Sequence, residues 1–582
     1  MNFKEDLELN KLNHSCAHLL AQAVKRLYPQ SKFWVGPVIE SGFYYDMDLQ
    51  DVVIKEADLA NIEAMMKKIS KEAKYIIRQE LSKAQALEIF AGDEYKLDLI
   101  ENLPESEIIS VYRQGEFIDL CRGPHVASTK EIKYFKLLKV SGAYYKGDSH
   151  NKVLQRIYGV CFFSEEELNQ YLQLLEEAKR RDHRKLGKEL DLFMNHELVG
   201  SGLPIFLPNG ALIRRKLERY ILDKETALGY QHVYSPSLAT VELYKTSGHW
   251  DHYHENMFPV MKMEGEDLVL RPMNCPHHML VYKNALRSYK ELPLRIGELA
   301  HDFRYEASGA VSGIERVRQM CQNDAHIFVT PEQIKEEFGR VVNLILDVYQ
   351  DFHFTDYTFR LSLRDKANKA KYFDDDEMWE KAENELRTVL KDLQLNFYEA
   401  PGEAAFYGPK LDVEVKTAIG HEITLSTCQL DFLLPQRFDL TFVDADGSKK
   451  RPVVLHRAIL GSIERFMAFL IEQYAGAFPL WLAPLQIEII PVHATKHLKY
   501  AQNIQKRLDK LGLTTYLNAS EEKFNYRLRQ SQLKKVPFTL IIGDQEILSK
   551  EVNLRSFGTS DSTNIKFVDF LKLVKKRLED HL

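Results

Sequence analysis

Hydrophobic and polar residues are arranged along the chain in patterns that predict four successive regions. In the first, residues 1–163, apolar residues at helical spacing predict a helix from His14 to Leu27, and alternating residues predict a strand over Phe117 to Leu120. A capping-box pattern at Ser164 then opens a long charged helix, which we predict to run over residues 164–188 as a link between domains.

The next region, residues 189–483, mixes amphipathic helices with strand-like pieces that do not alternate regularly. We predict a helix over residues 211–228 and strands over residues 411–415 and 431–434. Irregular alternation favours an antiparallel α+β layer over a doubly wound parallel fold.

The last region, residues 484–582, does alternate. The order of elements predicts a small parallel sheet with helices on both faces. Gly543-Asp544 is predicted to be a turn, since no nucleotide-binding fingerprint occurs there. The predicted strands cover 485–492, 514–517 and 538–542, and the predicted helices cover 497–511, 526–535 and 565–578. The whole pattern is that of a multidomain α+β protein with a C-terminal α/β domain.

One segment of the second region, His301 to Phe328, combines this patterning with a concentration of charge. Phe303 to Glu306 alternates like a strand, Ala307 to Gly313 has the small residues of a turn, and Val317 to Phe328 is predicted to be a returning strand. Such a hairpin presents fixed guanidinium groups to a polyphosphate, although a solvated, salt-bridged hairpin is the commoner alternative. Its charged residues include Arg304, Glu306, Arg316 and Arg318.

Composition restricts the class of protein. The chain is 45% hydrophobic and 28% charged, as globular proteins are, and its net charge of −6 means that nucleic acid would bind only at local basic patches. The first residues lack an apolar signal region, and the most apolar stretch, residues 478–492, is interrupted by Pro484, so we expect no secretory signal and no membrane span. Six scattered cysteines indicate a reducing cytoplasm.

Three residues far apart in the sequence form a candidate metal set. Cys275, His326 and His456 supply one thiolate and two imidazoles, which make a zinc shell with a fourth position open to substrate. Because the chain has 20 histidines, such a set is more often a coincidence when nothing else is known.

A second set lies in the first region. His14 and His18 are four residues apart in the predicted helix and therefore face the same side, and Asp119, Cys121 and His125 follow later. Together they are suited either to holding a metal or to positioning water for hydrolysis of an ester. A half-buried histidine pair without a ligand is the plainer alternative.

A third candidate is Gly461 to Phe466, a small-residue turn that leads into an apolar helix. Arg465 near the start of this helix can join the backbone N–H groups and the helix dipole in binding an anion. An arginine with a purely structural role is the commoner case.

Taken together, these segments resemble the class II aminoacyl-tRNA synthetases, and among them the threonyl-tRNA synthetases of bacterial type, over almost the whole chain. Gly229 to Pro236 resembles the first class motif, Phe303 to Glu306 the second and Gly461 to Phe466 the third. The threonyl assignment is supported by RPMNCP (271–276), QNDAHIF (322–328) and LHRAILGSIERF (455–466).

The resemblance implies a domain order and a reaction. It implies an editing domain over residues 1–163, a linker helix over 164–188, a class II catalytic domain with an antiparallel sheet over 189–483, and an anticodon-binding domain over 484–582. The implied reaction is ATP-dependent ligation of L-threonine to tRNA(Thr) through threonyl-adenylate, in a cytoplasmic homodimer without membrane contact. Hydrolytic editing of seryl-tRNA(Thr) is implied as well.

The resemblance also implies a reason for a metal. The family's Zn²⁺ is held by residues that match Cys275, His326 and His456, one ion per subunit, and Mg²⁺ accompanies ATP. A zinc ion that binds the β-hydroxyl rejects valine, whereas serine keeps the hydroxyl and differs by one methyl group, worth only about 1–3 kcal/mol. Editing of serine is therefore expected, with water positioned by the second set of residues, which we call the His14 cluster (His14, His18, Asp119, Cys121 and His125). A second zinc site in this cluster is the less favoured alternative.

Individual roles follow from the same resemblance. Arg304, Arg465 and Lys410 are expected to be catalytic, and Arg304, Glu306, Arg316 and Arg465 to bind ATP. Met273, Asp324, Tyr407, Gln429 and Ser462 are expected to bind threonine. His14, His18, Asp119, Cys121 and His125 are expected to carry out editing, and Glu546 and Arg555 to contact the anticodon.

Two departures from the family pattern are visible. The chain leaves no residues for the small ubiquitin-like domain that usually precedes the editing domain, and Glu422 to Thr427 stands where bacterial relatives carry a Trp-Gln-Cys-Gly stretch. A sibling enzyme that charges serine or proline, or a non-catalytic tRNA-binding paralogue, is the alternative function, although Arg304 and Arg465 argue against the latter.

Overall fold

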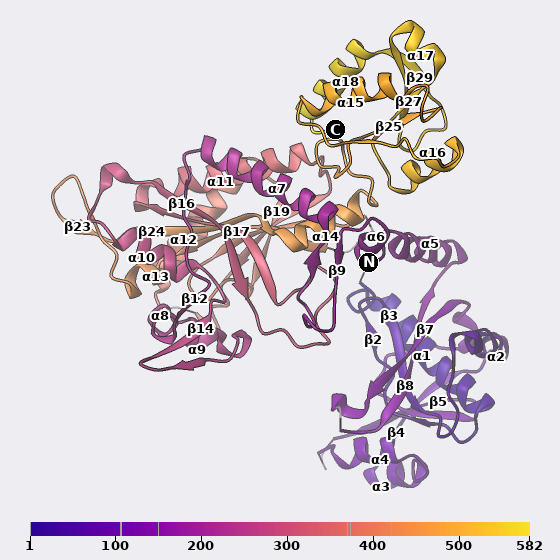
Figure 1. The fold of residues 1–582 in the computed structure, drawn as a ribbon. Coiled ribbons are helices and arrows are strands. Elements are labelled where there is room, and N and C mark those ends of the chain that lie inside the picture. Colours follow the sequence, from indigo (N-terminus) through magenta and orange to yellow (C-terminus); the bar gives the residue numbers. More distant parts are fainter. Residues whose placement is uncertain are drawn as a thin grey trace. The chain divides into compact units, whose positions relative to one another are not determined.

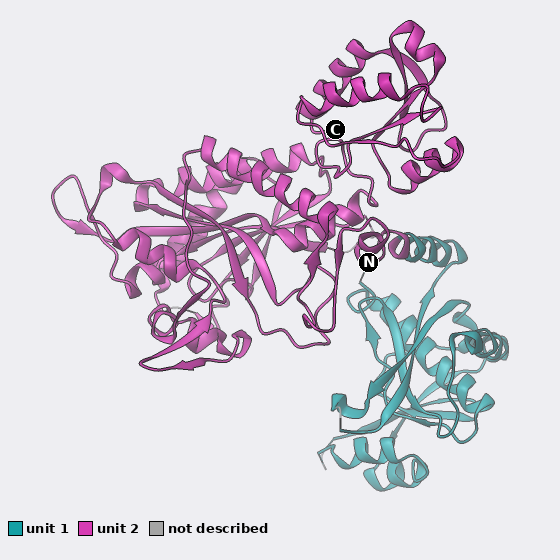
Figure 2. Cartoon of the chain, viewed as in Figure 1, with its two compact units in different colours: residues 1–177 teal, residues 178–582 magenta. Residues whose placement is uncertain are grey.

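A computed structural model describes residues 2–104, 107–148, 150–368, 371–372, 374–418, 420 and 422–582. The chain divides into two compact units, residues 1–177 and residues 178–582, drawn in different colours in Figure 2. The multidomain α+β class is confirmed. Within the described part of the chain, every helix is too short or too polar to cross a membrane.

The first unit is built around helix α1 (Leu7–Leu27), which packs against an antiparallel sheet (Figure 1). The helix starts earlier than predicted because the Asp6 side chain accepts hydrogen bonds from the N–H groups of Glu8 and Leu9. The sheet order is β1-β3-β8-β7, with β2 beside β3. Their bounds are β1 Lys32–Phe33, β2 Val38–Ile39, β3 Gly42–Asp48, β7 Tyr134–Tyr144 and β8 Val153–Phe162.

A second sheet of the same unit has the order β4-β5-β6 and contains the predicted strand Phe117–Leu120, which is confirmed as β6. The other two strands are β4 Ile76–Leu81 and β5 Ile109–Gln114. The remaining helices are α2 Leu59–Lys71, α3 Lys83–Ile89 and α4 Glu94–Glu101.

The prediction of one long linker helix is wrong. Helix α5 (Glu165–Arg181) does begin at the Ser164 capping box, with the Glu167 N–H 3.2 Å from Ser164 Oγ. It ends at Asp182, whose backbone is not helical and whose side chain accepts the N–H of Arg184 at 2.8 Å. Asp182 thereby starts a separate helix, α6 (His183–Glu189).

The second unit contains an eight-stranded sheet of order β11-β16-β17-β24-β21-β20-β18-β19. All neighbouring pairs are antiparallel except β11–β16 and β18–β19, which confirms the predicted antiparallel core. The strands are β11 Gln231–His232, β16 Leu294–Phe303, β17 Gln319–Val329, β18 Tyr357–Leu363, β19 Phe397–Pro401, β20 Lys410–Lys416, β21 Glu422–Asp431 and β24 Val453–Ser462.

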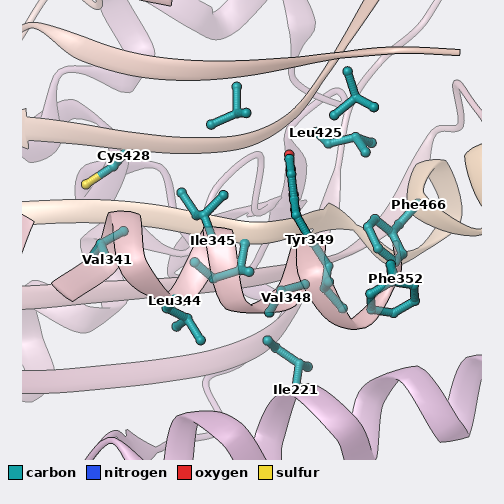
Figure 3. Close-up of a cluster of buried hydrophobic side chains, with 14 of the residues drawn as sticks. Ile221, Val341, Leu344, Ile345, Val348, Tyr349, Phe352, Leu425, Cys428 and Phe466 are labelled. Carbon is teal, nitrogen blue, oxygen red and sulfur yellow. The ribbon is translucent and has the colours of Figure 1, made fainter. Parts of the chain in front are cut away.

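Helices cover one face of this sheet with a continuous apolar core. Figure 3 shows α11 (Ile334–Asp351) between the strands and α7 (Pro208–Ala227), with Ile345 and Val348 pointing into the core. Helices α12 (Asp376–Asp392) and α14 (Ile463–Gln473) add to the same cluster. The other short elements are β9 Phe193–Met194, β10 Ile205–Phe206, β12 Leu238–Thr240, α8 Val241–Ser247, α9 His249–Tyr253, β13 Met261–Met263, β14 Glu266–Leu270, α10 Cys275–Lys283, β15 Arg287–Ser288, β22 Phe442–Val443 and β23 Lys449–Lys450.

Two predicted strands of this unit end differently from expectation. The returning strand predicted over residues 317–328 is confirmed as β17, which pairs with β16. The strand predicted over residues 303–306 is wrong: β16 precedes it and stops at Phe303, opposite Gln319, and residues 304–306 lie outside the ladder. The predicted strand over residues 431–434 is wrong. Asp431 ends β21, and its Oδ1 accepts the N–H groups of Leu433 and Leu434 to begin helix α13 (Leu433–Arg437).

The C-terminal sheet is only partly as predicted. Its order is β26-β25-β27-β28-β29; β25 (Ile487–Pro491) is parallel to β26 (Thr515–Leu517) and β27 (Phe538–Ile542), as expected. The two further strands are antiparallel, so the prediction of a wholly parallel sheet is wrong. These strands are β28 Glu551–Ser556 and β29 Thr563–Lys566, and they were not predicted because their residues are mostly polar.

Asp544 begins helix α17 (Asp544–Ser549) and is not simply part of a turn. The other helices of this part are α15 Leu498–Asp509, α16 Phe524–Leu533 and α18 Phe567–Glu579, close to the predicted bounds.

Candidate functional site

The register of the central sheet brings four predicted site residues into one row. Lys410 on β20 lies opposite Gln429 on β21, Gln429 lies opposite His456 on β24, and His456 lies opposite His326 on β17. Residues directly opposite each other on adjacent strands project from the same face. The row therefore collects side chains from positions 326 to 456 on one face of the sheet.

The predicted metal set is assembled at one end of this row. Cys275, at the start of α10, joins His326 and His456, and their ligand atoms all lie within 4.8 Å of one another. All three residues are buried, and the two imidazole rings have centroids 4.4 Å apart at an angle of 77°. His326 Nε2 is buried and has no hydrogen-bond partner among the residues that the structure describes.

Hydrogen bonds to the opposite ring nitrogens orient both imidazoles. His456 Nε2 lies 2.8 Å from Asp431 Oδ2, and His326 Nδ1 lies 2.8 Å from His278 Nδ1. Burial, and then the charge of Asp324, hold the pKa of the Cys275 thiol well above its usual range. A thiol and two imidazoles with free nitrogens are a donor set that suits zinc with one open position, so the residues fit the ion.

The side chains expected to bind threonine surround this set. Tyr407 stacks on His456 with ring centroids 5.3 Å apart, and its hydroxyl donates a hydrogen bond to Gln429 Oε1. Asp324 lies two residues before His326 on β17, and burial raises its pKa. Met273 packs at the edge of the neighbouring apolar cluster, whereas Ser462 lies farther along β24, opposite Gln322.

The arginines expected to bind ATP lie beside the hairpin and the α14 start. The Arg304 N–H donates to Arg318 O at 2.9 Å, and Arg316 forms an ion pair of 2.9 Å with Glu306. Arg465 Nε lies 3.3 Å from Glu315 O, and burial followed by the positive charge of Arg304 lowers the pKa of Arg465. The structure thus brings the predicted guanidinium groups together, with Glu306 bound to Arg316.

An aspartate that sequence analysis missed holds the Lys410 ammonium. Asp412 Oδ2 lies 2.9 Å from Lys410 Nζ, and it also accepts hydrogen bonds from Ser362 Oγ at 3.0 Å and Arg360 Nη2 at 2.9 Å. The available signal was the alternation of β20, which places Lys410 and Asp412 on the same face.

The segment that departs from the family pattern lies next to the α14 turn. Thr424 pairs with Glu414 beyond a shift of register after Val413. The backbone oxygen of Leu425 lies so close to Gly461 that a Cβ there would be 2.7 Å away. The shift changes which face the side chains of this segment reach.

The first unit assembles the second predicted cluster. The ligand atoms of His14, His18, Cys121 and His125 lie within 4.8 Å of one another, and Cys121 Sγ is 3.2 Å from both His14 Nε2 and His125 Nε2. Ser15 Oγ donates to Lys11 O at 2.7 Å, so the contact of 3.1 Å with His125 Nδ1 requires this nitrogen to be the donor. His125 Nε2 then carries a lone pair toward Cys121.

A buried charged group closes the base of this cluster. Asp119 Oδ2 lies 3.4 Å from His18 Nε2, and its other oxygen lies 2.5 Å from Lys96 Nζ. Tyr45 donates its hydroxyl to Asp119 Oδ2 at 2.5 Å. Lys96 (3% exposed) and Tyr45 were missed, because a lysine on α4 and an aromatic residue on β3 carry no local sign of this role.

Burial keeps the cluster neutral. It raises the pKa of Cys121 to about 12 and, together with the neighbouring imidazoles, holds the pKa of His125 far below its ordinary value. Cys121 Sγ is in direct hydrogen-bond contact with a ring nitrogen of His14 and of His125. A thiol that donates and accepts hydrogen bonds between two imidazoles suits the positioning of water and a ribose hydroxyl.

The two residues expected at the anticodon are placed differently. The Glu546 carboxylate is buried and accepts the Gly543 N–H at 2.8 Å, which caps α17. Arg555 lies on β28, where its Nε donates to Thr559 O at 3.2 Å. Their anticodon contacts stay a prediction.

Three family models match the chain. The model of the tRNA synthetase class II core domain (G, H, P, S and T) covers residues 258–474. The threonyl and alanyl tRNA synthetase second additional domain covers residues 109–158, and the anticodon binding domain covers residues 486–577. The matched ranges contain the metal set, part of the His14 cluster and the C-terminal sheet, respectively.

Curated relatives are similar over nearly the whole chain. A threonine–tRNA ligase of Listeria monocytogenes is 59% identical over 97% of this chain and 89% of its own length. A threonine–tRNA ligase of Geobacillus kaustophilus is also 59% identical, over 97% of this chain and 87% of its own.

Solved structures of aminoacyl-tRNA synthetases are similar to this chain as well. The RNA binding domain of threonyl-tRNA synthetase from Cryptosporidium parvum is 35% identical with a TM-score of 0.64, over 68% of this chain and 98% of its own. A prolyl-tRNA synthetase from the same organism has a TM-score of 0.53, over 68% of this chain and 74% of its own, at 16% identity, and shares the fold alone.

Proposed function

Because the chain belongs to the threonine–tRNA ligase family, we propose that its two clusters divide the work of one enzyme between synthesis and editing. The enzyme ligates L-threonine to tRNA at the expense of ATP, and its additional domain hydrolyses mischarged tRNA. Identity of 59% to threonine–tRNA ligases, against 16% to a prolyl-tRNA synthetase structure, disfavours a proline-charging sibling.

We assign threonine selection to Cys275, His326 and His456 with one Zn²⁺ per subunit. When bound, the ion supplies a Lewis-acid centre for the amino group and the β-hydroxyl of threonine. The observation that carries this assignment is the buried, unpartnered His326 Nε2 beside a thiol and a second imidazole, within the part of the chain that the structure describes. The Asp324 carboxylate accepts a hydrogen bond from the amino group of threonine, and the Tyr407 ring packs against the threonine side chain.

The chain's own cations stabilise the reacting phosphates. Arg304 and Arg465 bind the phosphates of ATP. Arg316 breaks its ion pair with Glu306 and binds the outer phosphate itself, and Mg²⁺ offsets the remaining negative charge of the triphosphate. The threonine carboxylate attacks the α-phosphorus of ATP, and pyrophosphate departs. Lys410, which forms an ion pair with Asp412, lies near this carboxylate during the attack. Positioning and charge stabilisation carry the step, without a protein nucleophile.

Editing belongs to the His14 cluster. His14, His18 and His125 position water and the terminal ribose, while Cys121 donates a hydrogen bond in its thiol form. Asp119 and Lys96 hold the base of the site. The extra methyl group of threonine excludes the correct product by its volume.

Three further proposals concern the oligomeric state, the cellular compartment and the anticodon contacts. Tyr234 is 93% exposed, and Leu228 and Leu238 are exposed nearby in the sequence, which supports a homodimer through the segment Gly229 to Pro236. The described residues include all six cysteines, and each is a free thiol, which supports a reducing cytoplasm. Glu546 and Arg555 are proposed to read the anticodon of tRNA(Thr).

Pyrophosphate exchange with threonine, serine and valine tests the synthetic site. We expect exchange with threonine, weaker exchange with serine and almost none with valine. Cys275→Ser removes the thiolate and should lower zinc content and threonine exchange together, by at least about tenfold. Cys161→Ser, the same change at a buried cysteine of the other unit, is the control. Threonine exchange that survives in Cys275→Ser without zinc contradicts the proposal.

Accumulation of seryl-tRNA tests the editing site. His18→Ala should let seryl-tRNA accumulate while threonylation continues at the parental rate, because His18 lies only in the first unit's cluster. His150→Ala, at an exposed histidine of the same unit, is the matched control. Equal release of serine by His18→Ala and the parent refutes the assignment.

A further inference from the structure

We propose that His278 is a positioning residue that fixes the tautomer of His326, so that a buried relay from Glu298 through His278 prepares His326 Nε2 to bind the metal. The inference rests on the proposed function, because it concerns the same zinc site. It adds a residue with no ligand atom of its own in that site.

The relay is continuous and buried. His278 lies one helical turn after Cys275 on α10, and both His278 and His326 are 0% exposed. His278 Nε2 lies 3.1 Å from Glu298 Oε2, and His278 Nδ1 lies 2.8 Å from His326 Nδ1. The two rings meet edge to face, with centroids 4.7 Å apart.

The position of each proton follows from the first acceptor. Glu298 accepts the Ser235 N–H at 2.9 Å and the Ser235 hydroxyl at 2.7 Å, and Arg271 lies 3.4 Å away. Burial raises the pKa of Glu298, but hydrogen bonds from His278 and Ser235 and the charge of Arg271 outweigh it and lower the pKa to about 2. With both Ser235 donors and the Arg271 guanidinium beside it, Glu298 is a carboxylate that accepts hydrogen bonds. The contact between His278 and Glu298 therefore requires the proton to be on His278 Nε2.

The second contact then has only one direction. A neutral His278 with its proton on Nε2 has a lone pair on Nδ1, so His326 Nδ1 must be the donor. His326 Nε2 is left with a lone pair, and this atom is buried near Cys275 and His456. It has no hydrogen-bond partner in the described part of the chain, and Asp324 Oδ2 lies 3.8 Å away, beyond hydrogen-bond distance.

One competing contact is weaker. Asn274 Nδ2 lies 3.4 Å from His278 Nε2 and would act as a donor to it. The contact is longer than that to Glu298, and a carboxylate is the stronger acceptor. Asn274, Glu298 and His326 are the polar groups that face the His278 ring.

The sheet explains why a relay is needed at His326 and not at His456. The carboxylate of Asp431 reaches His456 directly, at 2.8 Å. On β16 the residue opposite His326 is Ile296, whereas Glu298 lies opposite Asp324, two residues along the strand. His278 spans this offset, and it connects the metal set to Ser235 in the segment proposed for the dimer.

Zinc affinity of the full chain tests the relay. Competition against a chromophoric chelator measures it without substrates, and Co²⁺ in place of Zn²⁺ reports the ligand geometry through its absorption. His278→Ala should weaken zinc binding by about 10–100-fold, the usual effect of removing an orienting partner of a ligand. His278→Asn should restore most of the affinity, because its amide oxygen takes the place of Nδ1 as acceptor.

Two further variants make the test specific. Glu298→Gln should weaken zinc binding in the parent but not in His278→Asn, whose acceptor no longer depends on Glu298. His277→Asn is the matched control: His277 is the adjacent buried histidine of α10, and its ring lies 6.5 Å from that of Tyr244. It should bind zinc as the parent does.

Each other outcome decides against the relay. Parental affinity in His278→Ala, equal losses in His278→Ala and His278→Asn, or an equal loss in His277→Asn would overturn it. A parent that binds no zinc overturns the zinc assignment and the relay together. A parent that binds zinc, with His278→Ala unchanged, overturns the relay alone.

Discussion

Single residues in the two clusters owe their chemistry to burial and to their immediate partners. Cys275 and Cys121 are both thiols whose pKa burial raises, and each lies beside two imidazoles. Around Cys275 the imidazoles are oriented by Asp431 and His278, which leaves ring nitrogens free for a metal. Around Cys121 the imidazole nitrogens of His14 and His125 contact the sulfur itself, an arrangement that favours the proposed positioning of water.

The pKa of Cys121 leads to a prediction about its reactivity. Because burial raises this pKa to about 12, deprotonation is disfavoured and only about 1 in 10,000 thiols is ionised at pH 8. Alkylation by iodoacetamide, followed by mass spectrometry, should be slow and should rise about tenfold per pH unit from pH 8 to 10. Cys121→Ala removes the signal. A rate that levels off near pH 9 indicates an ordinary thiol and contradicts the prediction.

For single residues, the motifs predicted the members of the two clusters but not the buried residues that contact them. Cys275, His326 and His456 stand in characteristic local sequences, so a resemblance reaches them. Lys96 and His278 act only through contacts with residues distant in the sequence, Asp119 and Glu298. A lysine or histidine on a helix gives no local indication that it is buried against a carboxylate.

Elements act on the sites through register and close backbone contacts. The loop before β20 carries Tyr407 and Lys410, and Pro409 O accepts the Leu430 N–H at 3.1 Å. Gly408 lies so close to β21 that a Cβ there would be 1.9 Å from Leu430 O. The loop therefore holds both side chains only while position 408 lacks a side chain.

Gly408→Ala should consequently impair synthesis. Relief of the clash must move the loop, and a displacement of about 1 Å near the reacting groups costs about a hundredfold in rate. We expect threonine-dependent pyrophosphate exchange to fall by roughly that factor. Gly339→Ala on α11, where a Cβ would have Val389 Cγ1 as its nearest neighbour at 3.9 Å, should keep full activity. Normal exchange in Gly408→Ala would show that the loop tolerates the shift.

Helix α7 is joined to the back of the sheet by a buried ion pair, which yields a prediction about stability. Glu225 lies 2.8 Å from Arg457 Nη2 on β24, and it accepts hydrogen bonds from Asn323 on β17 and His232 on β11. Glu225→Ala leaves Arg457 buried and unpaired, so unfolding of this unit in urea should become easier by about 3–5 kcal/mol. Glu218→Ala, at a more exposed position of α7, should cost much less. Equal stability of Glu225→Ala and the parent would contradict a role for the pair.

Strongly periodic elements were predicted well, and their ends less well. The hairpin, α7 and the parallel strands of the C-terminal sheet follow from apolar spacing. The ends moved where a carboxylate caps a helix: Asp182 divides the linker, and Asp431 starts α13. The polar strands β28 and β29 were not predicted, because they become strands through pairing and not through their own pattern: β28 pairs with β27, and β29 pairs with β28.

The whole molecule separates synthesis and editing into units with cores of their own. The apolar cluster that includes Leu12, Ile62 and Cys161 lies entirely within residues 1–177, and the large cluster under the eight-stranded sheet lies within residues 178–582. Each unit contains one complete predicted cluster. The hydrolytic and synthetic sites therefore do not share side chains.

Separate expression of the two units should separate the two activities. Residues 178–582 should activate threonine at nearly the parental rate but accumulate seryl-tRNA, because the His14 cluster is absent. Residues 1–177 should fold and release serine from seryl-tRNA, more slowly than the full chain because fewer contacts hold the tRNA. Activity assays of both fragments beside the full chain check this. Loss of threonine activation in residues 178–582 would show that the units depend on each other.

The sequence by itself determined the class of fold, the family and the members of both clusters, because these are properties of local motifs and of apolar spacing. Only the tertiary structure decided which residues share a face of the sheet and which buried groups support them. The row from Lys410 to His326 exists through strand register, and the relay through His278 exists through hydrogen bonds between distant segments. Such contacts depend on where strands and helices meet in space, which leaves no trace in local sequence.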